Sequence, residues 1–145
     1  MSYLVDTNIL LRSIQENHPM HESSVQAVRK LLAQEETLCI VPQNLIEFWV
    51  VATRPLEVNG LGLSVADALQ ELEQMKTFFV LLPDTALIFS AWETLISKYK
   101  IIDKPSHDAR LVAAMTVHNM THLLTFNIND FKRFSEIIAI DPRDI

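Results

Sequence analysis

The sequence predicts an α/β fold in which a parallel sheet is covered by helices on both faces. Short apolar segments that fit buried strands alternate with longer segments of helical periodicity. The strand candidates are apolar at consecutive positions, which is typical of strands buried on both faces of a parallel sheet. With 145 residues, of which 49% are hydrophobic, the chain is long enough for one core and too short for two. We therefore expect a single domain over residues 1–145.

Two strand and helix units make up the N-terminal third. We expect strands at Tyr3–Val5 and Leu38–Val41, because both are short apolar runs ended by a polar residue or proline. Residues 6–8, Asp-Thr-Asn, favour a helix N-cap, and Pro42 fits the first turn of the second unit's helix. The predicted apolar faces of two helices are Val25, Val28, Leu31 and Leu32, and Leu45, Phe48, Trp49 and Ala52.

The middle of the chain begins with its longest predicted loop, residues 54–63, which holds both glycines and a proline. Ser64, with an acidic residue three positions later, predicts a helix that runs to about Lys76. A strand is expected at Phe78–Leu82, and Asp84 or Thr85 can cap the helix that follows. That helix has a predicted apolar face of Phe89, Trp92, Leu95, Ile96 and Tyr99.

The C-terminal part adds a helix and two strands. The small residues of the segment 106–114 favour a helix that packs closely on a sheet. Strands are expected at His122–Thr125 and Ile137–Ile140, with a turn rich in Asn and Asp after the first. The five strand candidates and the helices between them indicate a parallel sheet.

Composition excludes several classes of function. A net charge of −6 argues against a broad basic surface for nucleic acid, although a bound divalent cation could neutralise the acids locally. Two glycines in the whole chain leave no Gly-rich phosphate loop, so kinases and classical dehydrogenases are set aside. The single cysteine, Cys39, allows no intramolecular disulfide. With no signal-like or membrane-spanning run, we expect a cytoplasmic protein without membrane contact.

Acidic and amide residues follow several of the predicted strands. Asp6 comes directly after the first strand, and Glu47 lies in the helix after the second. Asp108 lies in the first turn of its helix, while Asn127 and Asp130 follow the fourth strand. Each has an ordinary alternative use, such as helix capping, a solvated position or a turn. The carboxyl ends of parallel strands share one edge, however, and hard oxygen ligands favour Mg²⁺ or Mn²⁺.

Four segments in this order resemble the PIN-domain nucleases, and most closely the VapC type of toxin from bacterial toxin–antitoxin pairs. They are Val5-Asp6-Thr7-Asn8-Ile9-Leu10-Leu11, Glu47 after the second strand, His107-Asp108-Ala109-Arg110-Leu111-Val112-Ala113-Ala114, and Leu124-Thr125-Phe126-Asn127 with Asp130-Phe131. The resemblance covers nearly the whole chain with the right order and spacing, and the combination is far more specific than any single motif.

The resemblance implies a three-layer α/β/α domain with a five-stranded parallel sheet, Mg²⁺ or Mn²⁺ in an acidic pocket, and RNA hydrolysis. Asp6, Glu47 and Asp108 fall on the family's three main acids and are the expected metal ligands. Asn127 occupies a place often held by aspartate, so either Asn127 or Asp130 completes the pocket, or three acids suffice. The matching hydroxyl positions, expected to orient the acids, are Thr7 and Thr125.

A toxin of this kind is also expected to form a homodimer and to be held by an antitoxin protein. Arg54, Lys104 and Arg110 are candidate contacts to RNA phosphates. Two other classes of function stay open. An aspartyl-phosphate phosphatase also has an aspartate after its first strand, but it requires a second one at position 8, which is asparagine. The other is a non-catalytic PIN-like module that binds RNA or protein, which the asparagine in place of the fourth acid would fit.

Overall fold

The computed structural model describes all residues, 1–145, and contains a five-stranded parallel sheet with seven α-helices. The strand order is β3-β2-β1-β4-β5, so the chain builds outward from the central strand β1 in both directions. The strands are β1 (Ser2–Val5), β2 (Thr37–Ile40), β3 (Val80–Leu81), β4 (His122–Leu124) and β5 (Ile138–Ile140). This confirms the predicted three-layer α/β/α fold with a five-stranded parallel sheet.

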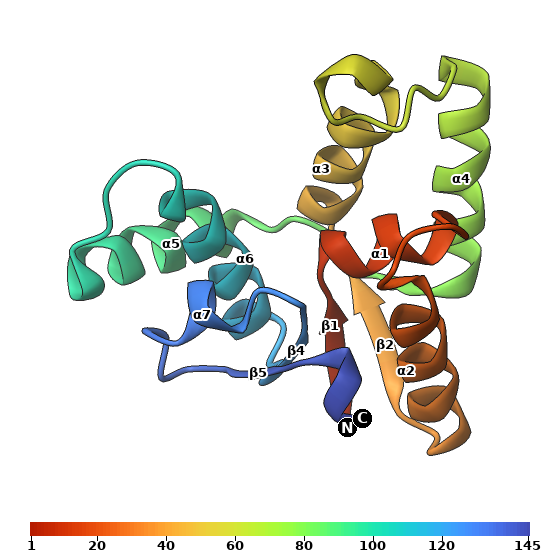
Figure 1. Cartoon of the computed structure of the whole chain (residues 1–145). Helices are drawn as coiled ribbons and strands as arrows, with labels where there is room; N and C mark the ends of the chain where they lie inside the picture. The colour runs from red at the N-terminus through yellow and green to blue at the C-terminus, as the bar shows by residue number, and fades with distance from the viewer.

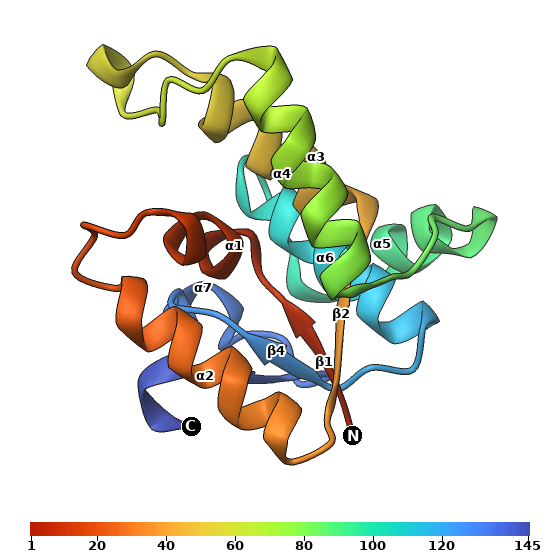
Figure 2. The same ribbon diagram turned by 90° about the vertical axis from the view of Figure 1, so that its right-hand side faces the viewer.

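Helices cover both faces of the sheet (Figure 1). They are α1 (Thr7–Ile14), α2 (His21–Ala33), α3 (Pro42–Thr53), α4 (Val65–Phe78), α5 (Ala86–Tyr99), α6 (Pro105–Val117) and the short α7 (Ile128–Phe131). Two 3₁₀ turns, η1 (Leu56–Val58) and η2 (Pro142–Asp144), follow α3 and β5. Figures 1 and 2 show α3 and α4 extending past the strand ends as an arm.

Two hydrophobic clusters, one on each face, hold the layers together. Alternate residues of a strand point to opposite faces, and in β1 Leu4 belongs to one cluster while Tyr3 and Val5 belong to the other. The cluster around Leu4 includes the buried side chains of α5 and α6, and the cluster around Val5 includes those of α1, α2 and α3. The strand ends of β1 and β4 are therefore fixed between two packed layers.

The predicted helix starts agree with the structure at two caps. The hydroxyl of Ser64 accepts the N–H of Asp67 at 3.1 Å, and that of Thr85 accepts the N–H of Leu87 at 3.3 Å. Thr85, not Asp84, is thus the cap of α5. None of the helices is both long and apolar enough to cross a membrane.

Three local predictions differ from the structure. The strand expected at Phe78–Leu82 is only Val80–Leu81, because α4 continues to Phe78 and β3 is an edge strand paired with β2 alone. Phe89 is 64% exposed and Ile88 is buried in its place, so the apolar face of α5 is shifted by one residue. Leu32 is 40% exposed, since α2 presents Val28 and Leu31 to the core.

Candidate active site

The centre of the candidate site is Asp6, at the point where β1 gives way to α1. Its Oδ1 accepts the N–H of Thr7 at 2.8 Å and so caps α1. The register Val5 with Leu124 places the ends of β1 and β4 side by side, and the hydroxyl of Thr125 donates to Asp6 Oδ2 at 2.6 Å. Capping and site formation are therefore compatible uses of the same carboxylate.

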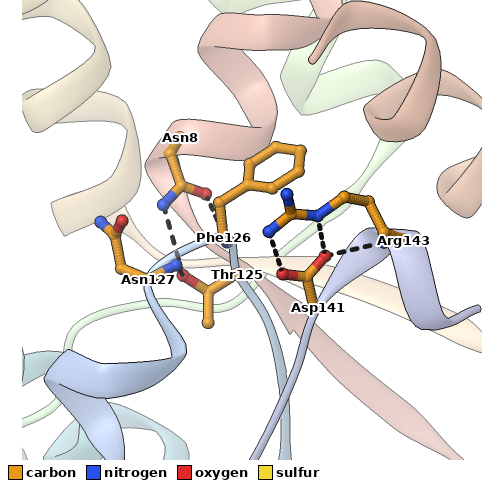
Figure 3. A network of polar contacts seen from close by, with 6 residues as sticks. All are labelled: Asn8, Thr125, Phe126, Asn127, Asp141 and Arg143. Carbon is orange, nitrogen blue, oxygen red and sulfur yellow. Dashed lines mark hydrogen bonds and ion pairs between the residues drawn. The ribbon is translucent and has the colours of Figure 1, made fainter.

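Asn8 and Thr125 belong to the polar network drawn in Figure 3, and both also contact the Asp6 carboxylate. The Asn8 amide nitrogen lies 3.3 Å from Thr125 Oγ1 and 3.4 Å from Asp6 Oδ2, and its oxygen accepts the N–H of Phe126 at 3.4 Å. Thr125 Oγ1 also accepts the N–H of Asn127 at 3.0 Å. The fully buried Thr125 thus has a single defined orientation, with its hydrogen directed at Asp6.

Glu47 reaches the same edge from α3. Its Oε2 accepts the hydroxyl of Thr7 at 3.4 Å, and its Oε1 accepts the amide of Gln43 at 2.7 Å. The start of α3 is fixed by Asn44, whose side-chain oxygen accepts the N–H of Val41 at 2.9 Å. The structure therefore places Thr7 against Glu47 and Thr125 against Asp6, one hydroxyl for each acid.

Asp108 lies in the first turn of α6, where the helix N-terminus favours a negative charge. The structure sets this turn beside α3, because the Gln43 amide donates to the carbonyl oxygen of His107 at 2.8 Å. The negative charges of Asp130 and Glu47 raise the pKa of Asp108, and His107 and Arg133 lower it. Asp108 is thus within electrostatic reach of both α3 and α7.

Two of the three main acids are hard to ionise in the absence of a cation. Burial is the main cause that raises the pKa of Asp6 to about 6, and the charges of Glu47 and Asp108 add to it. The hydrogen bonds from Thr125 and Thr7 lower the pKa and offset part of this rise. Burial, followed by the charges of Asp130 and Glu47, raises the pKa of Asp108 to about 6 as well. Carboxyl groups perturbed by burial and by each other mark a functional-site candidate.

The two candidates for the fourth position are placed differently. Asn127 is exposed, approaches the network through its backbone N–H, and forms no side-chain cap on α7. Asp130 is also exposed, but its charge is the foremost one acting on Asp108. Electrostatically, Asp130 is therefore the residue that joins the group of acids.

The three basic residues predicted to contact RNA phosphates lie in different surroundings. Arg54 ends α3, seven residues beyond Glu47, which is about 10 Å along a helix axis. Lys104 is exposed at the N-cap of α6. Arg110 is occupied within the molecule, since it donates to Gln43 Oε1 at 3.0 Å and lies 3.4 Å from Asp84 Oδ2.

Sequence reasoning did not select Gln43, Asn44 or Arg133. Gln43 is four residues before Glu47 and therefore on the same helix face, which is the signal that could have revealed it. Asn44 is at the third position after the strand-ending Val41, a place from which a side chain can cap a helix. No sequence signal separates Arg133 from the other surface cations.

The donor set suits a hard divalent cation. The carboxylates of Asp6, Glu47 and Asp108 and the side chains of Thr7, Asn8 and Thr125 in contact with them all offer oxygen, which is the ligand that Mg²⁺ and Mn²⁺ prefer. No group of three or more Asp, Glu, His or Cys side chains is arranged as a ready metal site. The acids share one electrostatic neighbourhood without forming a closed coordination shell, and a cation there would relieve the cost of ionising Asp6 and Asp108.

A protein-family model for the PIN domain matches residues 3–137. The chain therefore belongs to the PIN-domain family, whose toxins are generally nucleases. Among curated protein sequences, none matches this chain.

Several solved structures share the fold, and all are less than 25% identical to this chain. The VapBC2 complex from Rickettsia felis, bound to a DNA fragment from its promoter, has a TM-score of 0.71 at 20% identity and covers 97% of this chain and 98% of that one. VapBC-1 from nontypeable Haemophilus influenzae has a TM-score of 0.70 at 17% identity and covers 98% of both chains. VapC20 from Mycobacterium tuberculosis, a toxin that cleaves the sarcin–ricin loop, has a TM-score of 0.63 at 17% identity and covers 93% and 98%.

Proposed function

We propose that this chain is a divalent-metal-dependent endoribonuclease and the toxin of a toxin–antitoxin pair. The observation that carries the proposal is the approach of Asp6, Glu47 and Asp108 to one edge of the sheet, where the charges of Glu47 and Asp108 add to the raised pKa of Asp6 and the charge of Glu47 adds to that of Asp108. Membership of the PIN-domain family and the likeness to VapC-type toxins support the same conclusion. A cytoplasmic location remains the accompanying prediction.

In this proposal, Asp6, Glu47 and Asp108 hold Mg²⁺ or Mn²⁺, and Asp130 is the favoured fourth acid over Asn127. The cation would supply Lewis-acid activation and charge neutralisation for phosphodiester hydrolysis. The hydroxyl of Thr125 orients Asp6, and that of Thr7 orients Glu47. Asp6 is 7% exposed and accepts hydrogen bonds from Thr7 and Thr125, and the lone pairs that these donors leave free would be available to a cation.

Contacts to the RNA backbone require positive side chains at the rim of this acidic pocket. We propose Lys104 and Arg133, because Lys104 is exposed at the start of the helix that carries Asp108 and Arg133 is close enough to act on Asp108. Arg110 would have to leave Asp84 to take part, and Arg54 would meet a more distant part of the RNA.

The test is cleavage of total RNA by purified protein with Mn²⁺, with Mg²⁺ and with EDTA, followed by mapping of the cut sites. Asp6→Asn and Asp108→Asn should abolish metal-dependent cleavage while leaving the far-UV circular dichroism unchanged. The matched control is Asp67→Asn, an exposed acid in the first turn of α4. Cleavage retained by both site variants would remove the catalytic assignment.

The same assays separate the other two classes of function. RNA that is bound but left intact with either metal would favour a non-catalytic PIN-like module. Hydrolysis of a phosphate monoester without RNA cleavage would favour an aspartyl-phosphate phosphatase. We rank both lower because three acids are present and position 8 is an asparagine that is hydrogen bonded to Thr125.

We propose that the antitoxin binds through an apolar helical segment and that this segment occupies a groove between α1, α2 and α4. The groove has a volume of about 740 Å³, and its apolar lining includes Leu10, Ile14, Val28, Met75 and Phe79. The fold neighbours from Rickettsia felis and Haemophilus influenzae are toxin–antitoxin complexes. Phe78→Asp, at the exposed edge of the groove, should block neutralisation by the antitoxin but leave RNA cleavage intact.

We also propose that the protein forms a homodimer. Four large apolar side chains are exposed on α3 and α5 and are available for contact with a second copy; they are Ile46, Val50, Leu87 and Phe89. Light scattering after size-exclusion chromatography measures the mass directly, and a monomer at all tested concentrations would contradict this part.

A further inference from the structure

Gln43 forms the one side-chain link between the helix that carries Glu47 and the helix turn that carries Asp108. The side chain lies in the first turn of α3 and is 8% exposed. Its amide nitrogen donates one hydrogen to Glu47 Oε1 at 2.7 Å and the other to the His107 carbonyl oxygen at 2.8 Å. Both donor positions of the amide are therefore used.

The bond to His107 connects the two layers of the molecule, whereas the bond to Glu47 lies within α3. The buried residues of α3 belong to the hydrophobic cluster around Val5, and those of α6 belong to the cluster around Leu4 on the other face of the sheet. Without a bridge across the strand ends, the separation of Glu47 and Asp108 would depend on the packing of two independent layers. His107 is the residue directly before Asp108, so a bond to its carbonyl oxygen fixes the backbone from which Asp108 projects.

The orientation of the amide is determined by a third contact. Gln43 Oε1 accepts a hydrogen from Arg110 at 3.0 Å, and Arg110 is itself paired with Asp84. A flipped amide would direct its oxygen at two acceptors and its nitrogen at a guanidinium, which leaves all three contacts unmade. Only a side chain with two donors and one acceptor satisfies the position, which explains glutamine here and disfavours glutamate.

We propose that Gln43 is a positioning residue that sets Glu47 and Asp108 at the spacing needed for one shared cation, an inference that rests on the proposed metal-dependent function. Gln43 itself has no part in binding the substrate. Loss of the bridge lets the Glu47 carboxylate and the start of α6 move separately, which weakens cation binding. Residues that orient metal ligands in this way typically change metal affinity by about 10- to 100-fold when replaced.

The experiment compares Gln43→Met, which keeps the shape without donors, and Gln43→Glu, which keeps the shape and places a carboxylate against Glu47. The matched control is Gln26→Met, because Gln26 makes the same kind of bond within one helix, to Glu22 at 2.8 Å, on an exposed face of α2. Mn²⁺ binding is measured by calorimetry without RNA, and kcat and KM are measured for RNA cleavage. Circular dichroism and thermal unfolding report whether each variant is folded.

We expect Mn²⁺ to bind about 10- to 100-fold more weakly to both Gln43 variants and unchanged to Gln26→Met. The kcat at a fixed low Mn²⁺ concentration should fall, KM for RNA should stay near that of the wild type, and excess Mn²⁺ should restore kcat in Gln43→Met. A merely structural amide would lower thermal stability without this metal-dependent rescue.

Folded Gln43 variants that bind Mn²⁺ as the wild type does would overturn the inference. If the wild-type protein binds Mn²⁺ in a Gln43-dependent way but cleaves no RNA, the ribonuclease proposal fails and the positioning role of Gln43 stands. If the wild-type protein neither binds Mn²⁺ nor cleaves RNA, both fall together. Should Gln43→Met not fold, Gln43→Glu decides, because it retains a polar group that can pair with Arg110.

Discussion

Replacement of Asp6 by asparagine should stabilise the metal-free protein at neutral pH while abolishing its proposed activity. Asp6 is 7% exposed, and burial raises its pKa from 3.8 to about 6, with further contributions from Glu47 and Asp108. A pKa rise of this size means that the ionised carboxylate costs the folded state about 3 kcal/mol at pH 7. Asparagine carries no charge and avoids this cost.

The sign of the pH dependence follows from proton binding. Between pH 3.8 and about 6 the folded state holds more of the Asp6 proton than the unfolded state does. The free energy of unfolding therefore falls as the pH rises through this window, and the full penalty is present above it. Asp108, whose pKa is also raised to about 6, acts in the same direction.

Not all of the 3 kcal/mol is regained by Asp6→Asn. The carboxylate accepts both the Thr7 N–H and the Thr125 hydroxyl, whereas an amide has one oxygen and must direct its NH₂ group at one of them. The Asn8 amide also points at Asp6 Oδ2, the oxygen that accepts the Thr125 hydroxyl. In Asp6→Asn, an NH₂ group at this place would face the NH₂ group of Asn8. Because a lost hydrogen bond of this kind costs about 1 to 2 kcal/mol, the net gain at pH 7 should be about 1 to 2 kcal/mol.

Urea unfolding in EDTA at pH 4.5, 5.5, 7 and 8 measures the effect in wild-type protein, Asp6→Asn and the exposed-acid control Asp67→Asn. The stability of Asp6→Asn should exceed that of the wild type at pH 7 and 8, and the two should converge or cross near pH 4.5. The reasoning is refuted if Asp6→Asn is less stable than the wild type at pH 8, or if both proteins lose stability equally between pH 4.5 and 7.

Three further predictions use the same unfolding assay. Mn²⁺ at 100 times its dissociation constant should raise the free energy of unfolding of the wild type by about 2.7 kcal/mol. The gain should be smaller below pH 6, because metal ligands must lose their protons to bind. Equal stabilisation of Asp6→Asn would contradict this prediction. Thr125→Val should cost about 1 to 3 kcal/mol because the bonds to Asp6 and to the Asn127 N–H are lost, whereas Thr125→Ser keeps the hydroxyl; equal losses in both would disprove the hydroxyl's role. Phe48→Ala should cost about 3 to 5 kcal/mol since Phe48 is fully buried, and Leu69→Ala on the exposed side of α4 should change stability by less than about 0.5 kcal/mol; similar losses would show that burial does not set the contribution of Phe48.

Sequence patterns predicted those parts of the fold that depend on local chemistry. The predicted strand Tyr3–Val5, which the structure extends to Ser2–Val5, and the α1 cap Asp6 follow from an apolar run that meets a capping residue. The helix starts at Ser64 and Thr85 follow in the same way from side chains that reach backbone N–H groups two or three residues later. The parallel sheet then follows from the alternation of elements, because strands separated by a helix return in the same direction.

The errors fall where tertiary contacts decide. Val80–Leu81 is a strand only because it pairs with β2, and the apolar character of Phe78 and Phe79 does not show that α4 continues to that point. Phe89 has the right residue type for the core but is turned outward, and its ring packs against Trp92 with a centroid separation of 5.5 Å. Apolar identity alone cannot tell which of two neighbouring apolar residues points inward.

For the candidate site, the sequence predicted acids that act electrostatically on one another in the structure, but not the amide that links their helices. Asp6, Glu47 and Asp108 were found from their places relative to strands and helix starts. The four-residue spacing relates Gln43 to Glu47, but nothing in the sequence relates it to the carbonyl oxygen of His107, which is 64 residues away. Backbone acceptors carry no signature in the amino-acid sequence, so long-range links of this kind become visible only in the folded chain.

The energetic balance at Asp6 connects the fold to the proposed chemistry. Hydrogen bonds from Thr125 and Thr7 stabilise its ionised form, yet burial and two neighbouring acids outweigh them, so the metal-free site is unfavourable at neutral pH. A purely structural helix cap would not gain from these neighbours, since an exposed Asp or Ser caps a helix equally well. A divalent cation would reverse the balance by turning the same acids from repelling charges into ligands. The unfavourable arrangement of the acids is therefore what a metal-dependent site requires and what a cap alone does not explain.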